Sequence, residues 1–140
     1  MSSAAKSRLA DPTTILRFGL VGISGVGVNT FFLWFFTDVA RVDYRISSPI
    51  AVELSILSNF LLNNHWTFRD SSNTSRLSSR MLKFHLTAAG GFVINFTFLV
   101  GLTELAGLYY LLSNLVGILA AFAWNYSVNV RWTWGEHRRS

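Results

Sequence analysis

The sequence contains no cysteine, which excludes a disulfide framework, a thiolate metal site and a cysteine nucleophile. Charged residues make up only 14% of its 140 residues, whereas an ordinary soluble domain has about 25%. The three histidines, His65, His85 and His137, are too scattered to indicate a metal cluster. No Ser/His/Asp grouping, surface carboxylate pair or glycine-rich phosphate loop is present. We therefore expect no enzyme activity, no metal site and no cofactor.

Hydrophobic residues are abundant, at 51% of the chain, and the mean hydropathy is +0.37. They form four runs, at about 15–36, 47–66, 84–105 and 110–130. A bilayer core of ~30 Å needs about 20 helical residues, and each run supplies about that number. The sequence therefore predicts an all-α membrane protein with four transmembrane helices, in which Pro49 is tolerated in the first turn of the second.

The chain repeats itself after 66 positions. The text NFLLNNHWTF at 59–68 returns as NYSVNVRWTW at 125–134. One ungapped shift superimposes residues 16–68 on residues 82–134. We interpret this pattern as a tandem duplication, so that the four helices consist of two two-helix repeats.

The basic residues predict the orientation of the chain. Ten of the twelve Lys and Arg residues belong to the termini and the central loop, against Arg41 and Arg45 in the other loops. The positive-inside rule then places both termini in the cytoplasm, in a multi-pass protein of the cell membrane. The repeats are expected to be parallel, related by a pseudo-two-fold axis along the membrane normal. The sequence therefore predicts an N-terminal cytoplasmic tail over 1–14, a membrane domain over 15–134 and a C-terminal cytoplasmic tail over 135–140.

Polar side chains within the predicted spans fall into two layers. Asn29 and Asn95 lie ~20 Å from the cytoplasmic entrance, and Glu53 lies at a similar depth, which makes these three a candidate outer tier. The candidate inner tier lies in the cytoplasmic half, where amides are surrounded by basic side chains. Its members are Asn59, Asn63, Asn125, Asn129, Arg17, His65, Lys83 and Arg131.

These polar residues have structural as well as functional interpretations. Asparagines in membrane helices often make interhelical hydrogen bonds of ~0.6–2 kcal/mol, and a packing motif is duplicated as readily as a site. Basic residues at helix ends set topology and extend their charge to the interface. Glu53 differs, because an intramembrane carboxylate costs at least ~2.5 kcal/mol and is a functional candidate by default. Its alternative is a protonated group in a structural hydrogen bond.

Two further patterns predict how the helices pack and end. Gly22, Gly25 and Asn29 follow i, i+3, i+7 spacing, which predicts a packing groove on one helix face. The sequences Trp-Thr-Phe at 66–68 and Trp-Thr-Trp at 132–134 are interpreted as anchors at the level of the lipid headgroups.

The segment LRFGLVGISGVGVN at 16–29, followed by the NFLLNNHWTF exit, resembles the GtrA-like family of small four-span membrane proteins. The resemblance covers 16–134, and the second repeat departs in detail, with Ala88 for Gly22 and Trp134 for Phe68. It implies a role in cell-surface polysaccharide synthesis, but no agreed catalytic residue. The matching positions are Arg17, Phe18, Val21, Gly22, Asn29, Asn59, Phe60, Asn63, Trp66, Thr67 and Phe68.

Three functions compete at this point. The first, implied by the resemblance, is translocation of a polyprenyl-phosphate-linked sugar, whose phosphate and sugar would meet the cations and amides of the inner tier. The second is a non-transporting membrane anchor or regulator of a polyprenyl-phosphate glycosyltransferase. The third is a proton-coupled exporter that uses Glu53. The chain is small, so a homo-oligomer or a glycosyltransferase partner is expected, in contact with membrane lipid and not with nucleic acid.

Overall fold

The first helix begins at a sequence-encoded cap. The Asp11 carboxylate accepts a hydrogen bond of 2.7 Å from the Thr14 hydroxyl, and this bond is the main cause that lowers the pKa of Asp11. Pro12 occupies the first helical position, where its fixed φ and missing N–H are favourable. Helix α2 (Pro12–Trp34) follows and ends in a π-helical turn, η1 (Phe35–Val39).

The computed structural model describes residues 3, 11–69 and 75–135. Within these residues the regular structure is entirely helical, as the composition predicts. Three helical segments, 12–39, 45–67 and 77–104, are long and apolar enough to cross a membrane. The remaining elements are α3 (Tyr44–Leu62), η2 (Asn63–Thr67), α4 (Leu77–Glu104), α5 (Tyr110–Val128) and η3 (Asn129–Thr133). The fold is that of an all-α membrane protein.

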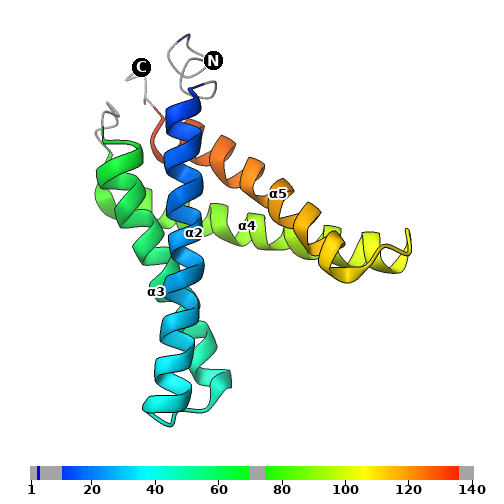
Figure 1. The fold of residues 1–140 in the computed structure, drawn as a ribbon. Helices are drawn as coiled ribbons and strands as arrows, with labels where there is room; N and C mark the ends of the chain where they lie inside the picture. The colour runs from blue at the N-terminus through cyan, green and yellow to red at the C-terminus, as the bar shows by residue number, and fades with distance from the viewer. Residues whose placement is uncertain (1–2, 4–10, 70–74, 136–140) are drawn as a thin grey trace. The chain divides into compact units, whose positions relative to one another are not determined.

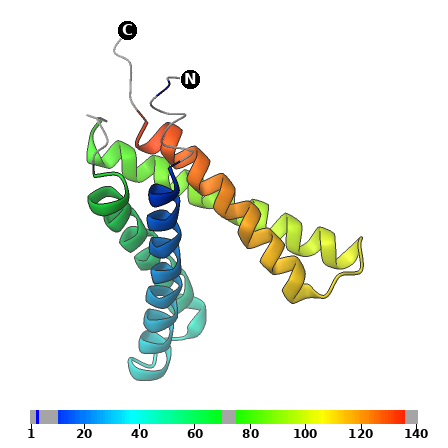
Figure 2. The ribbon, with the colours of Figure 1, turned by 45° about the horizontal axis from the view of Figure 1, so that its top comes forward.

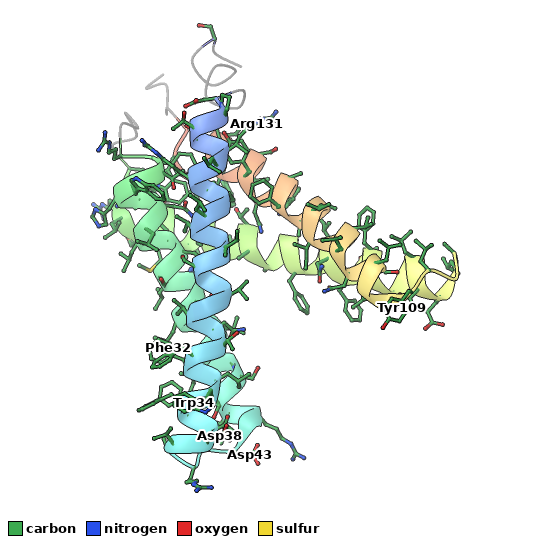
Figure 3. All side chains as sticks on the ribbon, in the orientation of Figure 1. Phe32, Trp34, Asp38, Asp43, Tyr109 and Arg131 are labelled. Carbon is green, nitrogen blue, oxygen red and sulfur yellow. The ribbon has the colours of Figure 1, made fainter. Side chains whose placement is uncertain are left out.

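The chain forms two compact units, and each is an antiparallel helical hairpin (Figures 1 and 2). The N-terminal hairpin consists of α2 and α3, and the C-terminal hairpin consists of α4 and α5. We call the end of each hairpin at which the short connection joins its two helices the turn end, and we call the opposite end the open end. Trp34, Asp38 and Asp43 lie toward the turn end of the N-terminal hairpin (Figure 3). Tyr109 lies at the turn end of the C-terminal hairpin, away from Arg131 at its open end.

Helix boundaries differ from the predicted spans in three respects. The connection between the first two predicted spans, 15–36 and 47–66, is shorter than predicted, because η1 continues the first helix and the Asp43 side chain caps α3. Helix α3 therefore starts earlier than predicted, and Pro49 lies in its second turn, not its first. Helix α4 begins at Leu77, before the third predicted span at about 84–105, because residues 77–83 include good helix formers and neither glycine nor proline.

Both turn ends use the left-handed backbone region. Arg41 has a φ of 59° in the N-terminal hairpin, and Gly107 has a φ of 68° in the C-terminal hairpin, 66 positions later. Glycine adopts this conformation without strain, whereas a residue with a Cβ loses roughly 1–2 kcal/mol. The two hairpins therefore reverse direction in the same backbone conformation with different residues.

A side-chain amide fills a glycine notch between the helices of each hairpin. A Cβ added to Gly25 would lie 2.8 Å from Cγ of Asn59, and one added to Gly91 would lie 3.0 Å from Cγ of Asn125. Within the described part of the chain, the buried Oδ1 of Asn59 and of Asn125 has no hydrogen-bond partner. Contact with glycine lets the backbones approach closely, as small residues do in membrane helices.

The predicted groove of Gly22, Gly25 and Asn29 is correct only at Gly25. Gly22 is exposed, and a Cβ placed there would meet no atom within 4 Å. The buried positions of α2 are Phe18, Val21 and Gly25, which have the same i, i+3, i+7 spacing and share Gly25 but centre on an adjacent part of the helix surface. The sequence is apolar on all faces here, so the period alone did not determine which face packs.

Candidate functional site

The open end of the N-terminal hairpin is formed by the π-helical turn η2. Its backbone closes with a hydrogen bond of 2.8 Å from Phe68 N–H to the carbonyl of Asn63, five residues earlier. The Thr67 hydroxyl donates to Oδ1 of Asn63 at 2.8 Å, and both side chains are buried. Such turns are rare and occur frequently at functional sites. Here the turn holds Phe68 inward while leaving Trp66 40% exposed.

Arg17 of α2 lies over the ring of Trp66, with its guanidinium carbon 5.6 Å from the ring centroid. A cation in this position is attracted by the electron-rich face of the indole. The next residue, Phe18, packs edge-on against Phe68, with the ring centroids 6.2 Å apart. This contact joins the beginning of α2 to the residue that follows η2. The arrangement places a half-buried guanidinium beside a partly exposed indole at the end of the hairpin.

The C-terminal hairpin contains the same arrangement 66 positions later. Lys83 of α4 has its ammonium 5.6 Å from the centroid of Trp132, and Trp132 is also 40% exposed. We call Arg17 with Trp66, and Lys83 with Trp132, the cation–indole pairs. The supporting contacts are Thr133 Oγ1 to Asn129 Oδ1 at 2.6 Å and Phe84 against Trp134 at 5.7 Å.

The four amides predicted for the inner tier lie behind these pairs, in helix contacts. Asn63 and Asn129 are buried and accept the threonine hydroxyls, while Asn59 and Asn125 pack against glycine. They hold each open end in shape. His65 and Arg131, each next to an indole of the pairs, are exposed. No group of three His, Asp or Glu able to hold a metal ion is found in residues 11–69 and 75–135.

The three residues predicted as an outer tier have separate surroundings. Glu53 is exposed on α3, and Asn29 is half-buried on α2. Asn95 of α4 points its Nδ2 toward α5, 3.4 Å from both the backbone carbonyl and Oδ1 of Asn114. For Asn95, this contact supports the structural interpretation, an amide bridging two helices of a hairpin.

Sequence reasoning missed the role of the two exposed indoles and misplaced one tryptophan. Trp66 and Trp132 are ring partners of cations, not only headgroup-level anchors. Trp134, predicted as such an anchor, is 0% exposed and packs on Phe84, because η3 turns it inward. A signal for the pairs was present, since basic residues and tryptophans both recur at the 66-residue offset.

Comparison with known proteins places this arrangement in a family. The model of the GtrA/DPMS transmembrane domain matches residues 17–134. A dolichol-phosphate mannosyltransferase from Pyrococcus furiosus is 43% identical over 120 residues, which is 86% of this chain and 33% of the relative. The chain thus spans about a third of the length of that relative. The match over residues 17–134 confirms the resemblance seen in the sequence, and the chain belongs to the GtrA/DPMS transmembrane domain family.

Proposed function

We propose that this protein binds a polyprenyl-phosphate-linked sugar by its phosphate and moves that lipid across the membrane. The observation that carries the proposal is the cation–indole pair at the open end of each hairpin. A neutral indole positions a cation without neutralising it, so the charge of Arg17 beside Trp66 stays available to a phosphate at the membrane surface. The family and the name of the relative supply the lipid class, a polyprenyl phosphate that carries a sugar.

Orientation is part of the proposal, because the open ends must face the compartment where the sugar is attached to its lipid. The basic residues favour open ends, termini and the central loop in the cytoplasm. The chain has no cysteine, so single cysteines can be introduced directly. A membrane-impermeant thiol reagent added outside intact cells is expected to label Asp43→Cys and not Ser75→Cys. Labelling of position 75 from outside would show that the chain has the opposite orientation.

Loss of one cation tests the phosphate contact. Arg17→Gln is expected to weaken binding of the lipid-linked sugar tenfold or more, because a charge-assisted hydrogen bond contributes ~1.5–3 kcal/mol. Arg17→Lys should restore part of the loss, since the charge is kept but the two-pronged geometry is not. Equilibrium binding of a labelled polyprenyl-phosphate sugar to purified protein measures both. The matched control, Arg41→Gln at the turn end, should bind normally; equal losses in the two glutamine variants would contradict the site.

A second candidate function is a membrane anchor or regulator of a separate glycosyltransferase. The observation that favours it is the name of the relative, a mannosyltransferase, of whose length the match covers 33%. In this case the protein would hold the lipid phosphate for a partner enzyme and would not transport it. Vesicles that contain only this protein separate the two functions. Movement of a labelled polyprenyl-phosphate sugar between leaflets supports translocation, whereas no movement, with a glycosyltransferase that needs the protein for activity, supports the anchor.

A further inference from the structure

We infer that one chain holds two anionic lipid headgroups at once, one at each cation–indole pair, and that the two positions differ in strength. The inference rests on the proposed function in taking the bound group to be a lipid phosphate. It goes further in fixing the number of bound lipids and the difference between the positions.

The number follows from the completeness of each pair within its own hairpin. The distance from cation to indole centroid is 5.6 Å in both, and both indoles are 40% exposed. Each pair also has its own π-helical turn, its own threonine-to-asparagine hydrogen bond and its own buried aromatic contact. Neither hairpin needs a residue of the other to build its pair, so each provides a separate binding position.

The charge at the first position is left largely available by its surroundings. Trp66 is neutral, so it orients the guanidinium of Arg17 without cancelling its charge. Asp11, on the same helix, is mainly engaged by Thr14, and the charge of Arg17 is the smallest of the causes that lower the pKa of Asp11. A mobile anion of the membrane surface is therefore attracted to Arg17.

Exposed leucines beside each cation identify the ligand as a lipid and not as free phosphate. Leu16 and Leu20 flank Arg17 and are 63% and 47% exposed, and they share a helix face because they are four residues apart. Leu82 and Leu86 flank Lys83 in the same way, at 62% and 53% exposed. An anionic group in contact with the cation thus continues into an apolar surface, which matches a headgroup with an acyl or prenyl chain.

The two positions differ in their cation. The guanidinium of Arg17 offers a planar fork that binds two phosphate oxygens at once, whereas the ammonium of Lys83 acts as a point charge. We therefore expect the N-terminal hairpin to hold a phosphate more tightly than the C-terminal hairpin. Exchanging the side chains should change these affinities, so that Arg17→Lys weakens phosphate binding at the first position and Lys83→Arg strengthens it at the second.

Native mass spectrometry of the detergent-solubilised full chain counts the lipids directly. With phosphatidylglycerol added, the wild type is expected to retain two lipids per chain, and with phosphatidylcholine none at the same concentration. Arg17→Gln and Lys83→Gln should each retain one phosphatidylglycerol, and the double variant none. The control Arg41→Gln should retain two. Inorganic phosphate at equal concentration should displace neither lipid.

Several outcomes would overturn the inference. Retention of a single lipid by the wild type, or loss of both lipids in either single variant, would indicate one shared site. Equal retention of phosphatidylcholine, or displacement by inorganic phosphate, would remove the anionic lipid as the ligand. The charge-preserving variants Arg17→Lys and Lys83→Arg test the same positions if a glutamine variant fails to fold; unchanged affinity in both would also contradict the difference. Absence of transport in vesicles would defeat only the translocation proposal, because the lipid count does not depend on movement.

Discussion

Trp134→Ala is expected to lower the free energy of unfolding by about 3 kcal/mol. Trp134 is 0% exposed, and its ring packs edge-on against Phe84 at 5.7 Å and 70°. Truncating a buried aromatic residue to alanine typically costs 3–5 kcal/mol. We expect the lower end, because lipid surroundings reduce the transfer part of the loss and leave mainly the packing part. Denaturant unfolding in micelles, followed by circular dichroism, measures the change.

Trp132→Ala is the matched control for this prediction. Trp132 lies two residues earlier in the same segment and is 40% exposed, so its loss should change the free energy of unfolding much less. Its effect should fall on lipid binding instead, because the ring that holds Lys83 is gone. Equal destabilisation by the two variants would show that the burial of Trp134 against Phe84 does not stabilise the C-terminal hairpin more than the exposed ring of Trp132 does.

Gly117→Ala is expected to destabilise the C-terminal hairpin by up to about 3 kcal/mol. A Cβ at this position would lie 2.7 Å from the backbone oxygen of Asn95 and 3.2 Å from its Cα. Overpacking usually costs 1–3 kcal/mol, and the upper end applies because backbone atoms cannot turn aside as a side chain can. Helices α4 and α5 must separate, which also breaks the long contact between Asn95 and Asn114. The same unfolding measurement in micelles applies.

Gly101→Ala supplies the comparison in α4. A Cβ there would meet no atom within 4 Å, so the change should be close to neutral or slightly stabilising through higher helix propensity. Gly25→Ala is intermediate, since the obstructing group is the amide of Asn59, which is able to rotate away. If Gly101→Ala and Gly117→Ala unfold alike, close backbone approach at Gly117 is not what holds this hairpin together.

The sequence predicted the elements well because their signals are strong and local. Apolar runs of membrane length predicted the helices, whereas the cap formed by Asp43 was not predicted and makes α3 start earlier than expected. The 66-residue offset also has structural content, since Gly25 and Gly91 meet equivalent amides. The predicted half-turn between the repeats and the cytoplasmic orientation stay predictions.

The candidate site was harder to predict, because it depends on rotation about helix axes. In a helix that is apolar all round, the period does not say which face packs, and so Gly22 was assigned to a groove that holds only Gly25. The π-helical turns change the direction of the side chains again at the C-terminal end of each hairpin. In η3 this change turns Trp134 inward and leaves Trp132 exposed. The 66-residue offset marks Lys83 and Trp132 as repeated positions, but no sequence pattern marks the π-helical turn that brings the two side chains together.

The amide of Asn59 in the notch of Gly25 favours one order of substitution at these two positions during evolution. If residue 25 gains a methyl group first, the intermediate is overpacked. If residue 59 becomes smaller first, the intermediate contains only a small cavity, which the next substitution can fill. The favoured order of substitution therefore begins with Asn59 on α3 and ends with Gly25 on α2. The same order applies to Gly91 and Asn125, so each hairpin can lose its notch independently of the other.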